Sequence, residues 1–285
     1  MKITRFYLFL SLLCVFSFYD FVNAENNNGL TDNMIEEAFI SFANPAYFPL
    51  LEVLIKSVHE FSTRPIIAYG VNADIPFDIK KYPRLIKRRI DGNQLIYYQK
   101  FRAILNSNVR YGIYLDADLI VNYKIDDLFQ KCRDVNAYPL CPIHPKDPED
   151  QWRIMSRFGI YEKTNPYVHN ALIVFSQACL PFIQECYDWY GHYGDLGCPW
   201  DELMLNIMVW KHKISNWYLP MCDPFYSFIS EYLKEQHMVY NGGKMVEVQY
   251  HVFHGCKDPN EALRNFEILK NNVGKPVYAS SIKSH

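Results

Sequence analysis

The sequence predicts an α/β fold, in which a single domain carries a mostly parallel sheet with helices on both faces. Short apolar or β-branched runs of strand length alternate with longer stretches in which apolar residues recur at helical intervals. Parallel strands need a crossover between them, and that crossover is usually a helix. The 285 residues allow one large domain or two, and no linker divides them, so we expect residues 36–285 to form one domain.

The first half of the chain supplies most of the predicted sheet. The apolar run EEAFISFA is followed by NPAYFP, a turn that opens a stretch with apolar residues at helical spacing, and PIIAYGVN is β-branched and flanked by turn formers. The predicted elements are, in order, strand 36–43, a turn and a helix within 44–61, strand 65–72, a weaker strand 84–90, helix 94–109 and strand 111–115.

The second half mixes helices with further strands. Residues 139–164 are rich in proline and charge and show no clear period, which is typical of a long functional loop or lid. Pro199 and Asp201 are an ordinary helix start signal. The remaining predicted elements are a turn and short helix at 124–129, strand 169–176, helices 180–193 and 199–213, and a strand within 245–255 that runs into a His-rich turn.

The first 24 residues have the pattern of a secretory signal peptide. Lys2 and Arg5 precede an apolar stretch that is shorter than the ~17 residues of a spanning helix, and Val22 and Ala24 fit the small-residue cleavage pattern. The alternative is an uncleaved anchor with the rest of the chain in the lumen. After a polar segment, 25–35, the domain begins. We therefore expect the protein in the secretory pathway (ER or Golgi lumen) or secreted, with membrane association only if the N-terminal segment stays uncleaved.

The cysteine count predicts the state of the thiols, and the net charge excludes one class of partner. Removal of residues 1–24 also removes Cys14, and an odd number of cysteines in an oxidising compartment leaves at least one free thiol or an intermolecular bridge. None shows the close paired spacing of a structural zinc site, so we expect disulfides and buried thiols. The formal charge of −2 gives no basic field, so nucleic acid is not an expected partner. The remaining cysteines are Cys132, Cys141, Cys179, Cys186, Cys198, Cys222 and Cys256.

Two aspartates, Asp116 and Asp118, stand one residue apart directly after the apolar run 111–115. Residues two apart on a strand project from the same face, so both carboxylates would meet where the strand ends. Close like charges need a cation between them, and hard oxygen ligands suit Mg²⁺ or Mn²⁺ held jointly with a phosphate. Ligands of open α/β sheets also bind at the carboxyl ends of the strands. The alternative is that Asp118 caps a turn and Asp116 pairs with a lysine.

The stretch IYLDADLIVNYKIDDLF, residues 113–129, resembles without a gap the glycogenin and lipopolysaccharide galactosyltransferase family of retaining glycosyltransferases. That family has a lysine sixteen residues before the first aspartate, and Lys100 stands at that distance from Asp116. AFISFANPAYFPLL resembles the family's first strand and turn, one residue shorter, where the family contacts uridine. The resemblance runs from about residue 38 to 257 and implies the GT-A fold and a UDP-sugar site formed by Ser41, Asn44, Tyr47, Lys100, Asp116, Ala117 and Asp118.

Two later motifs resemble the family less evenly. HNALIVF carries Asn170 where the family has an asparagine before a small residue and a glycine, but Leu172 replaces that glycine. PWDELMLN resembles an Asp-Gln segment of the family, with Asp201 at the aspartate near the reacting sugar and Glu202 in place of the glutamine. The resemblance implies that Asn170, Asp201 and Glu202 contact the reacting sugars. The alternative for the two acids is capping of a helix start and interaction with its dipole.

The family's third metal ligand is a histidine in the motif His-x-x-Gly-x-x-Lys-Pro-Trp, and this chain reads HVFHGCKDP at 251–259. His251 fits by its spacing from Lys257, whereas His254 fits by its place beside Gly255. We favour His251 as the ligand that joins the two aspartates on the metal, since imidazole is a competent ligand for Mn²⁺. Lys257 would then offset the charge that builds on the departing diphosphate. Its alternative is a solvated loop lysine.

Together the residues and the resemblance predict a glycosyltransferase (a hexosyltransferase) that uses Mn²⁺ or Mg²⁺. It would move a sugar from a nucleotide donor, UDP-sugar above all, to a hydroxyl of a glycan, lipid or protein acceptor, and the resemblance implies retention of anomeric configuration. Trp152, Trp189 and Trp200 either stack on an acceptor sugar or fill the core. The alternatives are a nucleotide-sugar hydrolase or nucleotidyltransferase, a catalytically inactive carbohydrate-binding protein of the same fold, and an interaction protein whose Asp-x-Asp is turn chemistry.

Overall fold

The computed structural model describes residues 33–144, 152–189, 200–219, 251–253, 257–271 and 273, and the backbone of 225–226, 238–241 and 244–247. The chain divides into the segment Met1–Asn33 and the unit Met34–His285, and the features below belong to the second. The predicted signal peptide lies outside the described residues, so the secretory location stays a prediction. In the part of the chain that is described, no helix has both the length and the apolar character that crossing a bilayer takes.

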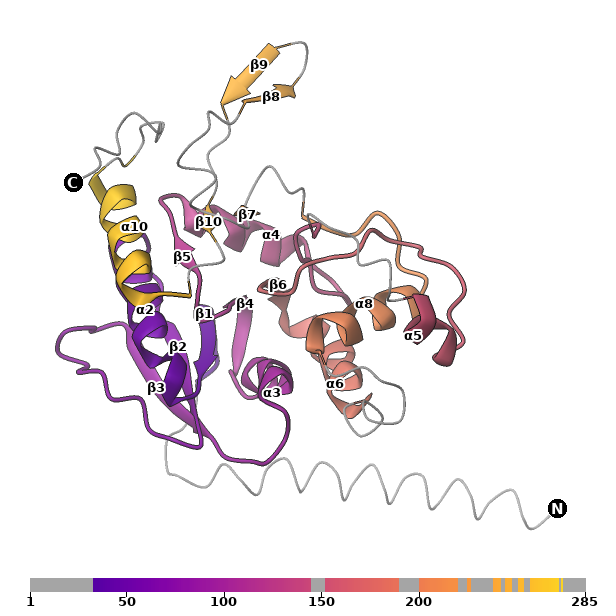
Figure 1. Ribbon diagram of the computed structural model, residues 1–285, viewed down its shortest axis with the longest axis horizontal. Coiled ribbons are helices and arrows are strands. Elements are labelled where there is room, and N and C mark those ends of the chain that lie inside the picture. Colours follow the sequence, from indigo (N-terminus) through magenta and orange to yellow (C-terminus); the bar gives the residue numbers. More distant parts are fainter. Residues whose placement is uncertain are drawn as a thin grey trace. The chain divides into compact units, whose positions relative to one another are not determined.

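The main sheet has five strands in the order β3-β2-β1-β4-β6 (Figure 1). The first four are parallel, and β6 pairs with β4 in the antiparallel direction. This confirms the predicted α/β class with a mostly parallel sheet. The strands are β1 (Ile35–Ala43), β2 (Ile66–Val71), β3 (Leu85–Ile90), β4 (Val109–Leu115) and β6 (Leu172–Ser176).

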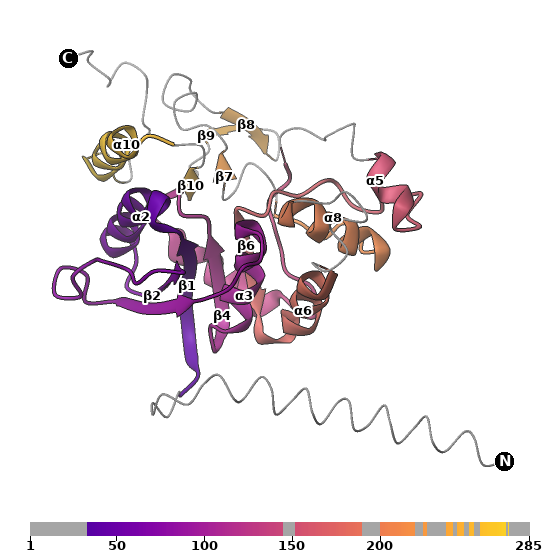
Figure 2. The same cartoon turned by 60° about the horizontal axis from the view of Figure 1, so that its bottom comes forward.

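Helices pack on both faces of this sheet, as predicted (Figure 2). From β1 the chain crosses through α2 to β2, and from β3 it returns through α3 to β4 on the other side of β1. Because parallel crossovers are right-handed, these opposite directions put α2 and α3 on opposite faces. The helices are α2 (Phe48–Phe61), α3 (Gln99–Leu105), α4 (Leu128–Asp134), α5 (Trp152–Arg157), α6 (Leu180–Asp188), α8 (Asp201–Lys211) and α10 (Pro259–Asn271), with 3-10 turns η1 (Pro45–Tyr47), η2 (Ile96–Tyr98), η3 (Ile125–Asp127) and η5 (Gln177–Cys179).

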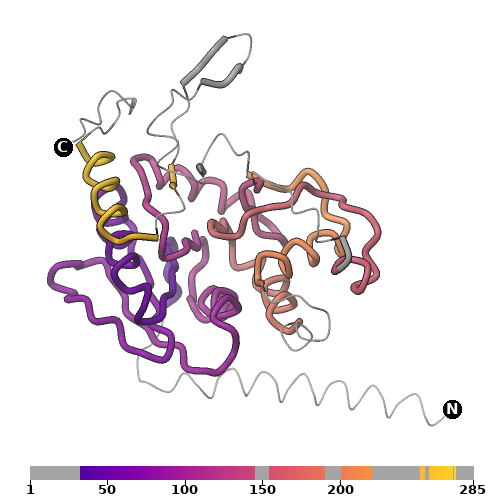
Figure 3. Tube along the Cα trace, in the orientation of Figure 1, coloured from indigo at the N-terminus to yellow at the C-terminus, as the bar shows by residue number. Residues whose placement is uncertain are grey.

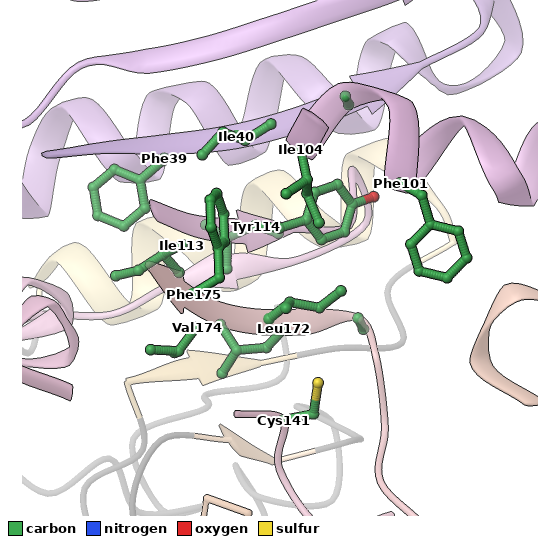
Figure 4. Packing of buried hydrophobic residues seen from close by; sticks show 14 of the residues in the cluster. Phe39, Ile40, Phe101, Ile104, Ile113, Tyr114, Cys141, Leu172, Val174 and Phe175 are labelled. Carbon is green, nitrogen blue, oxygen red and sulfur yellow. The ribbon is translucent and has the colours of Figure 1, made fainter. Parts of the chain in front are cut away.

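The core lies on both sides of β1, β4 and β6, whose side chains alternate between the two faces (Figure 4). On one face the ring of Phe39 packs edge-on against Phe129 of α4, with centroids 5.1 Å apart. On the other, Ile40 and Tyr114 point toward α3, where Ile104 is fully buried. Burial from both sides explains why these strands read as nearly continuous apolar runs rather than as alternating ones.

Short strands and one long helix form the rest of the described unit. The Cα tube in Figure 3 follows the chain by colour, from the indigo of β1 to the yellow of α10. Outside the main sheet, β5 (Ile120–Val121) pairs with β10 (Val252–Phe253), which also pairs with β7 (Phe225–Tyr226). A separate antiparallel pair is formed by β8 (Met238–Asn241) and β9 (Lys244–Glu247). Helix α10 packs on α2 through an apolar cluster that includes Leu50, Val53, Phe266 and Leu269.

Several predicted elements have other bounds in the structure; the strand predicted at 169–176, for example, is β6 and begins at Leu172. The strand predicted within 245–255 is two strands, because β9 ends at Glu247 and β10 begins at Val252 in a different sheet. The helix predicted over 94–109 is shorter, since α3 ends at Leu105 and Asn108 takes a left-handed φ of 52° before β4 begins. The loop predicted at 139–164 contains helix α5, and its residues Leu140 and Ile143 pair with Val174 and Val168.

We predict that Gly112→Ala destabilises the sheet. Gly112 of β4 pairs with Phe175 of β6, and a Cβ at position 112 would lie 2.1 Å from the buried Phe175 ring. Because the ring has no free space to enter, such overpacking should cost about 1 to 3 kcal/mol. The measurement is the free energy of unfolding in urea. Adding Phe175→Leu to Gly112→Ala should recover part of that loss of unfolding free energy. If the loss in the double variant equals the sum of the losses in the two single variants, the clash is contradicted.

Candidate active site

The strand order places several predicted residues at one edge of the sheet. The order reverses between β1 and β4, and the crevice at such a switch point, outside the carboxyl ends of the strands, is where open α/β sheets bind ligands. Ser41 lies near the carboxyl end of β1, and Asp116 follows β4. Because β6 is antiparallel to β4, Asn170 and Ala171 precede it at this same edge, and the Asp116 N–H donates to the Ala171 carbonyl at 2.9 Å.

The ammonium group of Lys100 joins the predicted residues of three segments. Its Nζ lies 3.1 Å from Asp116 Oδ1 and 2.8 Å from Asp201 Oδ2, and donates to Asn170 Oδ1 at 2.8 Å. Asn170 Nδ2 in turn donates to Asp201 Oδ2 at 2.7 Å. We call Lys100, Asp116, Asn170 and Asp201 the lysine cluster. Lys100 is in the first turn of α3, which starts at the carboxyl edge of the sheet and therefore points its first residues at the switch point.

Burial makes the charges of the lysine cluster strongly interdependent. Lys100 and Asp201 are each 4% exposed, whereas the Asp116 side chain is 26% exposed. Desolvation alone would lower the pKa of Lys100, but the charges of Asp116 and Asp201 more than offset it and hold this pKa above its ordinary value. Lys100 is therefore a permanent cation between two carboxylates. The alternative to a metal site was that Asp116 pairs with a lysine and Asp118 caps a turn, and the contact between Lys100 and Asp116 matches the first half of that alternative.

The two aspartates are held by a turn rather than by strand alternation. β4 ends at Leu115, and the Leu119 N–H donates to the Asp116 carbonyl at 3.1 Å, which closes a turn with Ala117 and Asp118 at its centre. The Tyr114 hydroxyl donates to Asp116 Oδ1 at 2.7 Å and fixes that carboxylate. Ala117 is buried, and Asp118 is partly exposed. The turn therefore presents Asp118 at the surface of the switch point while Asp116 reaches inward to Lys100.

The residues predicted to contact uridine lie around the start of α2. Ser41 is fully buried, and within the described residues its Oγ has no hydrogen-bond partner. The Asn44 side chain accepts from the Ala46 N–H at 3.1 Å and caps η1, and Tyr47 is exposed. An unsatisfied buried hydroxyl carries a desolvation penalty.

Asp201 and Glu202 open α8, as predicted, and their carboxylates bond to residues outside that helix. Trp200 is the N-cap residue, and Asp201 points into the lysine cluster. Glu202 Oε2 lies 3.1 Å from His169 Nδ1 and accepts from the Asn170 N–H at 3.4 Å. Their place in the first turn still suits the helix dipole. Both acids nevertheless contact residues that directly precede β6, and capping of α8 alone would not require such contacts.

The residues predicted near the C-terminus are not brought to the lysine cluster. His251 Nε2 lies 3.9 Å from Asp127 Oδ2, and the His251 carbonyl accepts from the Asn122 N–H. Within the described residues, Asp116, Asp118 and His251 do not form a group of close ligand atoms. From His251 to Phe253 the antiparallel register runs along β5 from Asn122 to Ile120, toward Asp118. His254 lies outside the described residues, Lys257 is exposed, and the ligand roles of these residues stay predictions.

The tryptophans that were expected to stack on a sugar or to fill the core differ in exposure. Trp200 is 49% exposed beside Asp201, whereas Trp189 packs against the core and stacks obliquely on Phe158. The side chain of Trp152 lies outside the described part.

Four cysteines, Cys132, Cys141, Cys179 and Cys186, are buried free thiols, and burial raises the pKa of Cys179 to about 11. The other three lie outside the described residues, so the predicted disulfides stay untested.

Sequence reasoning missed three residues that complete the site. Tyr114 orients Asp116, and a tyrosine two residues before an aspartate at a predicted strand end was a usable signal. His169 contacts Glu202, and Tyr167 hydrogen-bonds the same carboxylate. Neither carries a sequence signal, because their contact with α8 depends on how that helix packs beside β6.

Comparison with known proteins supports the fold. No protein-family model matches the chain, and no curated protein matches it. The solved galactosyltransferase LgtC, in complex with donor and acceptor sugar analogues, is 15% identical with a TM-score of 0.53 over 84% of this chain and 96% of that one. This chain has the GT-A glycosyltransferase fold.

Two further structures agree with that assignment. The glycosyltransferase GlyE of Streptococcus pneumoniae TIGR4 is 13% identical with a TM-score of 0.52, over 83% of this chain and 63% of that one. Mouse xyloside xylosyltransferase 1, in its apo form, is 12% identical with a TM-score of 0.50, over 78% and 98%. At these identities the likeness concerns the fold, and neither the glycogenin-like family nor a particular sugar follows from it.

We predict that removal of Lys100 is more damaging than removal of a surface lysine. Lys100→Met leaves Asp201 as a buried charge without its cation, which should cost about 3 to 5 kcal/mol of unfolding free energy in urea. Adding Asp201→Asn should make the double loss smaller than the sum of the single losses by about 1 to 3 kcal/mol. Lys211→Met, which breaks an exposed pair with Glu185, should cost less than about 1 kcal/mol. Additive losses at positions 100 and 201 would contradict the coupling.

We predict a pH-dependent stability difference between the wild type and Glu202→Gln. Burial raises the pKa of Glu202 to about 7 from its ordinary 4.5, despite the opposing charge of Lys100. The folded state therefore holds a proton that the unfolded state has released, so the stabilisation is complete below pH 4.5 and is lost as pH rises through 7.

The measurement is the melting temperature of both proteins at pH 5 and pH 8, with a metal chelator present. Raising the pH should lower the stability of the wild type relative to Glu202→Gln by about 3 kcal/mol at most, since each pKa unit corresponds to about 1.4 kcal/mol. An unchanged difference between the two pH values would show that Glu202 titrates normally.

Proposed function

We propose that the protein is a divalent-metal-dependent glycosyltransferase that moves a hexose from a UDP-sugar to an acceptor hydroxyl with retention of configuration. The observation that carries this proposal is the lysine cluster at the switch point of a GT-A fold. The N-terminal pattern of the sequence supports action in the lumen of the secretory pathway or outside the cell.

The donor side is formed by residues at the ends of β1 and β4. The partnerless Ser41 Oγ suits a polar group of a nucleoside, and the exposed ring of Tyr47 offers a stacking surface for a base. Asn44, one turn earlier, positions this segment by capping η1. Ligand binding at this edge therefore gives the buried hydroxyl a hydrogen bond that the described protein atoms do not supply.

The turn at Ala117 suits a divalent metal. Asp116 and Asp118 offer hard oxygen donors, and carboxylates are the ligands that Mg²⁺ and Mn²⁺ prefer. The third protein ligand would be His251 or His254. His251 Nε2 lies near Asp127 Oδ2 rather than near the two aspartates, so both histidines are candidates for substitution. A bound metal would neutralise the diphosphate as the bond to the sugar breaks. Lys257 would add a further positive charge near that leaving group.

The sugar side is formed by Asn170, Asp201 and Glu202. Lys100 holds the Asp201 carboxylate in place, and Asn170 donates to that same carboxylate. Asp201 is thus oriented before substrate arrives, which is the condition for stabilising a positively charged sugar in the transition state. The half-exposed Trp200 beside it offers an apolar surface to an acceptor sugar, lipid or peptide.

We predict that Mn²⁺ and a UDP-sugar together raise the melting temperature of the wild type. A donor present at about 100 times its dissociation constant stabilises by about 2.7 kcal/mol, which corresponds to roughly 5 to 10 °C in a protein of this size. A panel of nucleoside diphosphate sugars, each with and without Mn²⁺, identifies the donor. Asp118→Asn should abolish the metal-dependent part, whereas Asp134→Asn, the same change at the exposed end of α4, should leave it intact.

A product assay with and without acceptor separates transfer from hydrolysis. Formation of free sugar at the same rate in both conditions would identify a hydrolase, and the anomeric configuration of a transferred sugar tests retention. If no sugar nucleotide shifts the melting temperature with or without Mn²⁺, the proposed function is wrong.

A further inference from the structure

Two histidines that have no place in the proposed donor or sugar side form a compact group with Glu202 next to the lysine cluster. Ligand atoms of His144, His169 and Glu202 all lie within 4.8 Å of one another. Among the residues that the structure describes, no other three His, Cys, Asp or Glu side chains bring their ligand atoms this close together. The three residues come from separate segments: His144 follows α4, His169 precedes β6, and Glu202 lies in the first turn of α8.

Backbone pairing holds the two histidines in fixed positions. Ile143 and Val168 form an antiparallel bridge, and the His144 N–H donates to the Tyr167 carbonyl at 2.9 Å. The His169 N–H donates back to the Pro142 carbonyl at 2.8 Å. The imidazole rings consequently stack, with centroids 4.9 Å apart and an interplanar angle of 19°. Both rings are therefore presented side by side by two paired segments rather than by a loose loop.

The contacts of His169 Nδ1 are hard to satisfy with protons alone. This nitrogen lies 3.1 Å from Glu202 Oε2 and 3.2 Å from the Ala171 backbone N–H. If Nδ1 accepts from Ala171 it has no hydrogen for the carboxylate, and if it donates to the carboxylate it faces the Ala171 N–H hydrogen to hydrogen. A cation bound to both the imidazole and the carboxylate would replace the proton between them and would also displace the contact from the Ala171 N–H, because Nδ1 has one lone pair.

We propose that His144, His169 and Glu202 bind one divalent cation of the zinc class, at a site separate from the metal expected at Asp116 and Asp118. Two imidazoles and one carboxylate, with a fourth position for water, are a common zinc ligand set. Imidazole nitrogen also ranks Zn²⁺ above Mn²⁺ in affinity. Tetrahedral bonds of about 2.1 Å place ligand atoms about 3.4 Å apart, so the ligand atoms need to come closer than they are. The two stacked rings also need to turn, because ring lone pairs lie in the ring planes and nearly parallel planes do not meet at one ion.

Neighbouring contacts supply the support that metal ligands usually have. Tyr167 hydrogen-bonds Glu202, and its ring packs edge-on against His144 at 5.6 Å. His169 precedes Asn170, and Glu202 follows Asp201, so the cation ties together the two segments that meet at Lys100. The bound cation acts as a positioning element for Asn170 and Asp201, not as a partner of the diphosphate.

The test is zinc binding by the purified protein after removal of metals with a chelator. Competition with a chromophoric zinc indicator gives stoichiometry and affinity, and Co²⁺ in place of Zn²⁺ reports imidazole ligation and geometry through its visible absorption. We expect one tight site in the wild type, and at least about 100-fold weaker binding in His144→Gln. His169→Gln, the second ligand variant, should lose the same site, so that one poorly folded variant does not decide the outcome.

Two controls separate this site from other zinc-binding groups. His212→Gln breaks a His–Glu contact of 2.6 Å on α6 and α8 outside the proposed ligand set, and should leave the tight site intact. Asp118→Asn should also leave it intact while removing Mn²⁺ binding at the turn. Unchanged zinc affinity in both His144→Gln and His169→Gln, or loss of the tight site in Asp118→Asn, would overturn the proposal, as would the absence of a tight site in the wild type.

Discussion

The buried ammonium of Lys100 is the constraint on which the candidate site depends. A lysine that is 4% exposed needs carboxylates close by, and Asp116 and Asp201 supply them from two segments separated by 85 residues of chain. Asn170 completes the arrangement by bonding both Lys100 and Asp201. The ends of β4, β6 and α8 therefore cannot move independently, because separating any of them from Lys100 leaves a charge buried without its partner.

The sheet topology explains why these charges meet at this place. Strand order reverses between β1 and β4, so the carboxyl ends of two parallel strands and the amino end of the antiparallel β6 share one edge. The same reversal brings the start of α3, with Lys100, to that edge. A permanent cation and two acids then lie at the same edge as the turn of Asp118 and the end of β1, which carries Ser41. The GT-A fold and this polar edge together are the reason for proposing a nucleotide sugar as ligand.

The environment of Glu202 differs from that of its neighbour although both open the same helix. Asp201 has a lysine and an amide as partners, whereas Glu202 lies among His169, Tyr167 and the Asn170 N–H, with its pKa raised to about 7 by burial. A carboxylate in such a place is stable either protonated or bound to a cation. The adjacent histidines suit the second state, which is the one that the proposed zinc site would use.

The sequence by itself determined the α/β class and the order of the first strands and helices, because apolar periods are local properties of the chain. Its resemblance to a known family singled out Lys100, Asp116, Asn170 and Asp201, which the structure brings together and whose roles stay predictions. It did not determine which partners these residues take. The turn at Ala117 and the shorter α3 reflect local backbone geometry, whereas the split of the last predicted strand between two sheets follows from pairing with distant segments. The meeting of His144, His169 and Glu202 needs an antiparallel β6, a bridge from Ile143 to Val168 and the packing of α8, and contacts of that kind are decided by the tertiary structure alone.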